Sequence, residues 1–445
     1  GSEEAVELID SVLRAIIDAI EARGGDVLDF AGDALVALFD GDDAPLRATS
    51  TAAAIRGWFD RRAADVTSVG RVVLRAAVAV ATGPVDLVLA GSDEMVLCTA
   101  GPTATRLVLL ERAASGGDVL VCETTAAALA GQVRLIPRGG GYLLPGSVTP
   151  AALIGADAAY RGVDPSEDLR LVPRPLRESV AGGTFGLESD HRLATMAFLV
   201  TGGLDQRFAT DPADVARDLD DLFRAAGDIT AQHGVTMLTT DVTADGVALF
   251  LGAGVPLATG NAEERMLRAL RAILTTPVAE RLHARAGTHR GPVFAGVVGA
   301  PHRAIYSAMG DTTNLAARLA FRALPGELLA TSEVVSRSTV EFALEPAPEF
   351  RPKGKAFVVT PLRVGREIGR QGRTVERLPL VGRDRELHDL TDRLEAALAG
   401  AGGALTLVGE PGVGKSRLAA EILEDHRIRT RVVVRFTVGD ESTPY

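Results

Sequence analysis

The feature that most constrains the fold of this chain is an internal repeat. Residues 24–39, Gly-Gly-Asp-Val-Leu-Asp-Phe-Ala-Gly-Asp-Ala-Leu-Val-Ala-Leu-Phe, predict a strand, a tight turn and a second strand. A similar hairpin occurs 212 residues later, where Asp245 corresponds to Asp33, and further along Gly101 corresponds to Gly310 at an offset of 209 residues. Strands that alternate with helices exclude a helical solenoid and predict an α/β fold, an α+β sandwich with largely antiparallel sheets, for each copy.

The repeat predicts matching elements in the two copies. After the first hairpin we expect a helix, a long strand, a Gly-Pro turn and another strand. The second copy should begin with its own hairpin and continue with a helix and a strand-turn-strand unit. The expected ranges are 45–62 (helix), 72–80 and 96–101 (strands) in the first copy, and 233–238 paired with 241–250, 263–275 (helix) and 284–298 (strand-turn-strand) in the second.

Length and composition predict a cytoplasmic protein of two to three domains. A chain of 445 residues is too long for one core. A net charge of -11 argues against a nucleic-acid partner, which usually faces a basic surface. We find no apolar run that could span a membrane and no signal peptide. Cys98 and Cys122 fit neither a zinc site nor a disulfide framework, so we expect buried thiols.

The region after the repeat contains a phosphate-binding motif. Residues 161–190 and 366–377 predict linkers, and residues 378–445 the beginning of a third domain. There a strand at 404–408 is expected to lead into a P-loop, in which backbone amides cradle phosphates, the lysine reaches them and the serine binds magnesium. Because 29 residues follow the motif, we expect a truncated P-loop α/β ATPase domain. The P-loop residues are Gly409, Gly412, Gly414, Lys415 and Ser416.

The decapeptide 310–319, Gly-Asp-Thr-Thr-Asn-Leu-Ala-Ala-Arg-Leu, predicts a tight turn that opens into a helix. Asn314 and Arg318 are four residues apart and therefore project from one helical face. Arginine can donate two hydrogen bonds to phosphate oxygens while an amide orients a neutral oxygen nearby, so the pair suits a phosphorylated substrate. The alternative is an ordinary amphipathic helix that exposes an Asn and an Arg.

Residues 30–39 and 310–319 together resemble class III nucleotidyl cyclases, most closely the soluble, bicarbonate-responsive adenylyl cyclases. Residues 285–299 and 351–355 belong to the same resemblance. In that family two cyclase domains precede a P-loop ATPase region. The resemblance implies a first cyclase domain at 1–160 and a second at 191–365, pseudo-symmetric and paired within the chain. We call these ranges the first repeat and the second repeat.

The resemblance also implies a reaction. The ribose 3′-hydroxyl of ATP attacks the α-phosphate, which yields cyclic AMP and pyrophosphate with the help of two divalent cations, Mg or Mn. Asp33 would bind metal, although an Asp in a hairpin turn is also common for structural reasons. Asn314 would orient the ribose and Arg318 would stabilise the transition state. Lys353 or Lys355 would hold the terminal phosphates.

Three positions depart from the family pattern. Ser307 stands where the family contacts the purine, but the lysine expected to accompany it falls near 241–243, which contain none. An arginine expected beside the phosphates appears as Pro84. A second metal carboxylate would fall about twelve residues before Gly1, so the first strand of the first domain is absent from the chain.

The second interface between the repeats is expected to be inactive. Thr105 and Leu109 take the places of the Asn and Arg, and Val200 takes the place of the first metal carboxylate. The family holds its small-molecule regulator, bicarbonate, in such a degenerate pocket. Asp29 replaces the lysine that the relatives have there.

Three functions are consistent with these residues. The first is an adenylyl cyclase with one competent site, and the retained Asp33, Asn314 and Arg318 favour it. The second is a catalytically silent, cyclase-like module that regulates or senses nucleotides for a signalling ATPase, which the incomplete purine contacts favour. The third is a P-loop ATPase whose own hydrolysis is the function.

Overall fold

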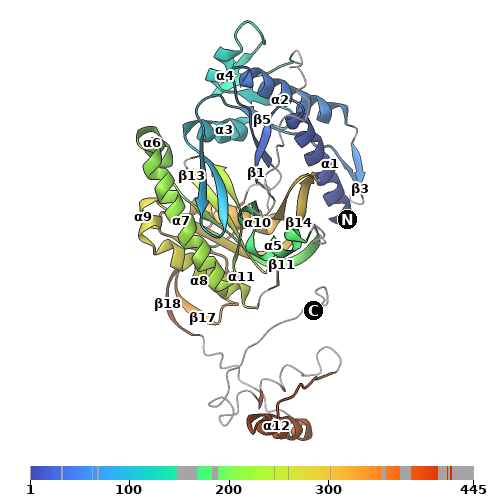
Figure 1. The fold of residues 1–445 in the computed structure, drawn as a ribbon, viewed down its shortest axis with the longest axis vertical. Coiled ribbons are helices and arrows are strands. Elements are labelled where there is room, and N and C mark those ends of the chain that lie inside the picture. Colours follow the sequence, from blue (N-terminus) through green and yellow to red (C-terminus); the bar gives the residue numbers. More distant parts are fainter. Residues whose placement is uncertain are drawn as a thin grey trace. The chain divides into compact units, whose positions relative to one another are not determined.

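The computed structural model divides into two compact units, residues 1–370 and 371–445, which are described separately (Figure 1). It describes residues 2–31, 34–62, 64–67, 70–146, 148, 168–182, 189–244, 246–258, 260–300, 302–352, 357–370, 382–408, 418 and 421–422.

The second repeat is built on one eight-stranded sheet. Adjacent strands of this sheet run antiparallel, except for β14 and β16, which run parallel. Strand β15 pairs with the far end of β14. This confirms the predicted mixed class with mainly antiparallel strands. The strands, from one edge to the other, are β12 (Thr236–Thr243), β13 (Gly246–Ala253), β11 (Asp190–Val200), β14 (Arg285–Ala300) with β15 (Arg303–Met309), β16 (Leu328–Ala330), β18 (Leu362–Arg370) and β17 (Val340–Pro346).

Helices cover both faces of this sheet. On one face α7 and α8 bury an apolar stripe that includes Leu219, Leu222 and Leu270. On the other face α10 packs through Ala316 and Ala320. Burial on both sides explains why β13 and the second half of β11 are almost continuously apolar. The helices are α6 (Leu204–Thr210), α7 (Pro212–His233), α8 (Ala262–Leu274), α9 (Pro277–Arg281), α10 (Asp311–Arg322) and α11 (Ser332–Val335).

The first repeat follows a similar order of helices and strands. It adds a small hairpin of β3 and β4, has two strands, β5 and β6, where the second repeat has the single strand β14, and shows no counterparts of the short helices α6 and α9 among its described residues. The parallel pair β5–β8 continues into β10 and β9, just as β14–β16 continues into β18 and β17. Among its described residues, β11 has no counterpart, and the strands form separate small sheets. The elements are α1 (Ser2–Glu21), β1 (Asp26–Ala31), β2 (Ala34–Leu38), α2 (Ala44–Arg61), β3 (Asp65–Thr67), β4 (Gly70–Val72), β5 (Val78–Val80), β6 (Asp86–Gly91), β7 (Met95–Ala100), α3 (Pro102–Ala113), β8 (Val119–Val121), α4 (Glu123–Ala128), β9 (Ile136–Arg138) and β10 (Gly141–Leu143).

Three predicted strands differ from the structure. The strand-turn-strand prediction for 284–298 is wrong, because β14 runs through Gly291 and Pro292 as one strand. The expected strand at 72–80 is interrupted between β4 and β5. In the second hairpin residues 241–243 end the first strand, and its partner begins at Gly246. The errors at 241–250 and 284–298 come from placing a turn by composition, and the error at 72–80 from extending an apolar run as one strand. Pairing with a neighbouring strand decides where a strand begins and ends.

The segment between the repeats, predicted as a linker, is helical where it is described. It contains η2 (Asp168–Leu171), η3 (Arg174–Leu176) and α5 (Arg177–Ala181). Leu176 is buried in the core of the second repeat beside Met196. Arg177 donates to the backbone oxygen of Asp93 at 2.7 Å and pairs with its carboxylate at 3.2 Å, so the segment contacts both repeats.

In the unit 371–445, helix α12 (Asp384–Leu398) packs Leu390 against Leu418 and Ile422. The expected strand at 404–408 is wrong, because these residues have no regular secondary structure. A parallel strand needs a hydrogen-bonded neighbour, and the described residues of this unit supply none. Throughout the described chain, no helix combines the length and apolarity needed to cross a membrane.

Candidate active site

Helix α10 is fixed at its first turn by two buried threonines. Gly310, with a φ of 132°, turns the chain from β15 into the helix. The hydroxyl of Thr312 donates to the backbone oxygen of Pro292 at 2.7 Å, and that of Thr313 donates to the oxygen of Ala308 at 2.8 Å. These bonds tie the helix to β14 and β15. The predicted turn and helix are therefore confirmed.

The body of α10 lies directly on β14. A Cβ on Gly287 would lie 2.1 Å from the nitrogen of Ala320 and 2.6 Å from the oxygen of Ala316, so only glycine allows this approach. With Ala316 and Ala320 held on the sheet, Asn314 is exposed and Arg318 is half-buried. The structure thus presents the predicted pair on a rigidly seated helix.

Ser307 and Asp241 lie on two strands of the large sheet that do not pair with each other, β15 and β12. Ser307 is 3% exposed on β15, where it pairs in register with Gly296. Asp241, on β12, stands within the range where the family lysine is expected. Burial is the main cause that raises the pKa of Asp241 to about 6, with Glu111 adding and Arg112 opposing. A weakly acidic carboxyl therefore replaces a fixed cation.

Several predicted site residues fall outside the described parts of the chain. Within those parts, no group of three or more His, Cys, Asp or Glu side chains could hold a metal ion. The metal prediction therefore depends on a residue whose surroundings are not described. The predicted residues concerned are Asp33, Lys353, Lys355, Gly409, Gly412, Gly414, Lys415 and Ser416.

At the interface that the sequence predicts to be degenerate, the structure shows a contact that the sequence did not predict. The hydroxyl of Thr105, on α3, donates to a carboxylate oxygen of Asp205, on α6, at 2.7 Å. Leu109, one turn further along α3, is 53% exposed. A leucine has no charge and a carboxylate repels an anion, so these side chains give no support to bicarbonate binding. Thr105 and Asp205 are too far apart in sequence for a local pattern to pair them.

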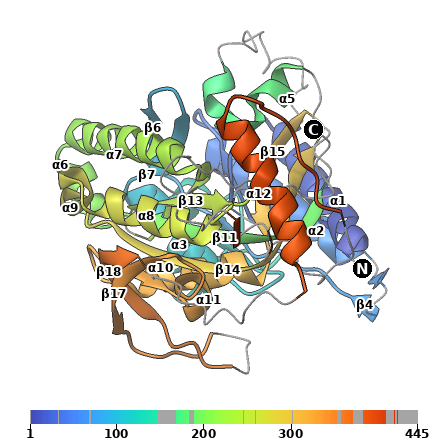
Figure 2. The ribbon, with the colours of Figure 1, turned by 90° about the horizontal axis from the view of Figure 1, so that it is seen from below.

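Each repeat packs a hairpin against a helix of the other repeat, and the two hairpins are equivalent. The β6–β7 hairpin of the first repeat lies against α7, and the β14–β15 hairpin of the second lies against α1 (Figures 1 and 2). At the tips, Gly91 donates its N–H to Asp220 on α7 at 2.9 Å, and Gly299 donates to Asp10 on α1 at 3.5 Å. The two donors and the two acceptors occupy corresponding places in the repeats. The packing is therefore reciprocal, as in a dimer with twofold symmetry.

Comparison with known proteins identifies two segments. Residues 198–362 match the model of the adenylate and guanylate cyclase catalytic domain, and residues 379–445 match that of an AAA ATPase domain. An adenylate cyclase of Mycobacterium tuberculosis is 28% identical over 175 residues, which cover 38% of this chain and 38% of that protein. The human guanylate cyclase soluble subunit beta-2 is 29% identical over 160 residues, or 34% of this chain and 25% of that protein.

The aligned regions thus span well under half the length of these relatives. A solved structure, the adenylyl cyclase CyaB from P. aeruginosa, is 20% identical and covers 40% of this chain and 96% of that one, with a TM-score of 0.34. That score is too low to establish a shared fold. The chain therefore contains a segment related to cyclase catalytic domains, which includes α10, followed by a segment related to AAA ATPases. The first repeat lies outside both matched segments.

Proposed function

We propose that the two repeats form an adenylyl cyclase that converts ATP to cyclic AMP and pyrophosphate at one site between them. The observation that carries this proposal is α10, which presents Asn314 and Arg318 on one face inside the segment that matches the cyclase catalytic domain. The reciprocal hairpins support pairing within one chain. The hydrogen bond between Thr105 and Asp205 supports an inactive second interface.

In the proposed reaction the ribose 3′-hydroxyl loses its proton to solvent and its oxygen forms a bond to the α-phosphorus, while the bond from the α-phosphorus to the bridging oxygen of the β-phosphate breaks. Negative charge grows on the phosphoryl oxygens, and the guanidinium of Arg318 stabilises it with paired hydrogen bonds. Asn314 orients the ribose. Lys353 or Lys355 holds the phosphates that leave as pyrophosphate. Divalent cations bound at Asp33, Mg or Mn, would neutralise further charge on the phosphates.

Arg318→Ala tests the proposal. It removes a cation needed mainly in the transition state, so kcat should fall by about 10²-fold or more with little change in stability. The measurement is formation of cyclic nucleotide from ATP and from GTP, with Mg and with Mn. Arg322→Ala is the matched control, because Arg322 lies one turn further along α10 with its guanidinium 4.1 Å from the ring centre of Phe350. An Arg318→Ala variant as active as the parent would refute the assignment.

A second candidate is a silent, cyclase-like module that senses nucleotides for the ATPase segment. The specific observation in its favour is Asp241, a carboxyl in the range where adenylyl cyclases have a lysine. The same assay separates the two candidates. Binding of ATP or GTP without any cyclic product, under either metal, would replace the enzyme proposal with this one.

A further inference from the structure

Strand β12 is an edge strand of the large sheet, and the first repeat covers its outer side. The hydroxyl of Thr239 donates to the carboxylate of Asp29, on β1, at 3.0 Å. The hydroxyl of the next residue, Thr240, donates to the backbone oxygen of Leu97, on β7, at 2.7 Å. A bulge between Met237 and Thr239 accompanies this arrangement. Two consecutive threonines therefore join one sheet edge to two strands of the other repeat.

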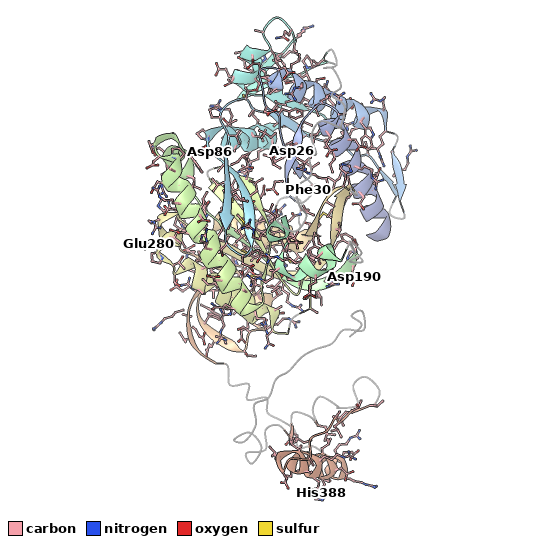
Figure 3. The ribbon with its side chains drawn as sticks, viewed as in Figure 1. Asp26, Phe30, Asp86, Asp190, Glu280 and His388 are labelled. Carbon is pink, nitrogen blue, oxygen red and sulfur yellow. The ribbon has the colours of Figure 1, made fainter. Side chains whose placement is uncertain are left out.

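This joint brings together two carboxyls that correspond in the repeat. Asp29 and Asp241 are separated by 212 residues, the same offset as Asp33 and Asp245. Asp29 is 8% exposed and also accepts a hydrogen bond from the N–H of Phe30 at 2.7 Å (Phe30 is labelled in Figure 3). Asp241, on the facing strand, is close enough to repel it.

The groups around the joint leave its charge uncompensated. Asp29 faces Asp241 and the buried thiol of Cys98, and burial raises the pKa of that thiol. Asp241 faces Arg112 and Glu111 on α3, whose charges oppose each other. The nearby cation Arg303, on β15, pairs with Asp26 of β1 and not with Asp29. Two ionised carboxylates in this place would repel each other in a poorly hydrated contact.

We propose that the strength of the joint between β1 and β12 depends on pH. The joint holds the repeats together most strongly when Asp29 and Asp241 carry protons, and it loosens as the pH rises and they ionise. Burial is the main cause that raises the pKa of Asp29 to about 7; Asp241 adds to the effect, and the bonds from Thr239 and Phe30 oppose it. The stabilisation that comes from protonating Asp29 is complete below the pKa of an ordinary carboxyl, about 4, and is lost as the pH rises through about 7.

A consequence for the nucleotide site rests on the proposed function. Strand β1 ends two residues before Asp33 in the sequence, and β12 belongs to the repeat that carries α10. A loosened joint would misplace the two halves of the site relative to each other. Asp29 is then a positioning residue, and the cyclase should lose activity on the alkaline side of neutrality earlier than its substrate chemistry requires.

The test is thermal unfolding of the full chain from about pH 5 to about pH 8.5, which needs no catalytic activity. In the parent, the Tm should fall as the pH rises through this range. Asp29→Asn keeps an acceptor for Thr239 but cannot ionise, so its Tm should exceed that of the parent by about 2 °C or more near pH 8 and by clearly less near pH 5. Asp60→Asn, an exposed carboxyl on α2, is the control and should follow the parent at every pH.

A loss of Tm that is the same at every pH would mean that Asp29 is only a structural hydrogen-bond partner, and would overturn the proposal. If Asp29→Asn does not fold, Asp241→Asn decides: removing the neighbouring charge should move the midpoint of the parent's pH dependence to lower pH, and an unmoved midpoint refutes the coupling. Amide hydrogen exchange near pH 8 shows where the effect lies. Exchange should be slower in β1 and β12 of Asp29→Asn than in the parent, and unchanged in α8. A failed cyclase assay leaves these measurements unaffected.

Discussion

Asp218 lies buried on α7 between two arginines from other helices. Arg207, on α6, approaches its carboxylate at 2.5 Å, and Arg281, on α9, approaches the other oxygen at 2.6 Å. Burial by itself would raise the pKa of Asp218, but the hydrogen bonds from Arg281 and Arg207 outweigh it and hold that pKa below its ordinary value. One carboxylate thus joins three helices of the second repeat.

Asp218→Asn should destabilise the protein by about 2 kcal/mol at pH 7, because it removes the charge that both arginines need. A carboxyl with a lowered pKa gives stability that is present above its unfolded value, about 3.9, and is lost as the pH falls through the folded value. The difference between parent and variant should therefore stay constant down to about pH 4.5 and shrink as the pH falls below about 4. Urea unfolding at several pH values measures it, with the exposed Asp228→Asn on the same helix as control. A difference that grows on acidification would contradict this account.

At the scale of single residues, the sequence predicts contacts only where they are local. Asn314 and Arg318 were predicted on one face because helical periodicity relates residues four apart, and the structure confirms that placement. The hydrogen bond between Asp29 and Thr239 joins residues from different repeats, and no local pattern specifies such a pair. The replacement of the family lysine by Asp29 was visible in the sequence, but its partner was not.

Between elements, the approach of α10 to β14 is set by one glycine. Gly287→Ala would force its new methyl group into the helix backbone, which cannot move without shifting the whole of α10. We expect a loss of about 3 kcal/mol or more, or failure to fold. Gly227→Ala is the matched control, because this glycine lies inside α7 and its Cβ would meet only the methyl carbon of Met237, at 3.7 Å. That change should stabilise the protein by about 0.5–1 kcal/mol. Denaturant unfolding of Gly287→Ala and Gly227→Ala measures both changes in unfolding free energy. Equal changes would contradict the close packing of α10 on β14.

At the scale of elements, helices were predicted better than strand ends. Helix α2 begins and ends within one residue of its predicted range, because Pro45 and an apolar periodicity mark it locally. The Gly291-Pro292 pair predicted a turn, yet Pro292 pairs with Leu193 on β11 inside a continuous strand. Long-range pairing with β11 therefore outweighed the local turn preference.

For the molecule as a whole, the repeat in the sequence becomes a reciprocal pairing in space. The offsets predict two similar units, and the two repeats follow a similar order of helices and strands. They could not predict which surfaces meet, because the hairpins contact helices of the opposite repeat. Gly91 and Gly299 both have positive φ, and a Cβ at either position would meet a backbone oxygen within 2.5 Å, so both tips require glycine.

The two tip contacts differ in length, which gives a ranked prediction. Gly91 donates to Asp220 at 2.9 Å, whereas Gly299 donates to Asp10 at 3.5 Å, the limit of a useful hydrogen bond. Asp220→Ala should therefore cost about 1–2 kcal/mol of unfolding free energy and speed amide exchange at Gly91 by about tenfold. Asp10→Ala should cost less than about 0.5 kcal/mol.

Asp220 also pairs with Arg224 on its own helix at 2.7 Å, so Arg224→Ala is the control that removes this pair and keeps the bond to Gly91. Because the Asp220–Arg224 pair is solvent-exposed, it should be worth about 0.3–0.5 kcal/mol. Exchange at Gly91 should then stay close to that of the parent. If Asp10→Ala proves as costly as Asp220→Ala, or if Arg224→Ala frees the Gly91 amide, the hairpin tips do not hold the repeats together as described.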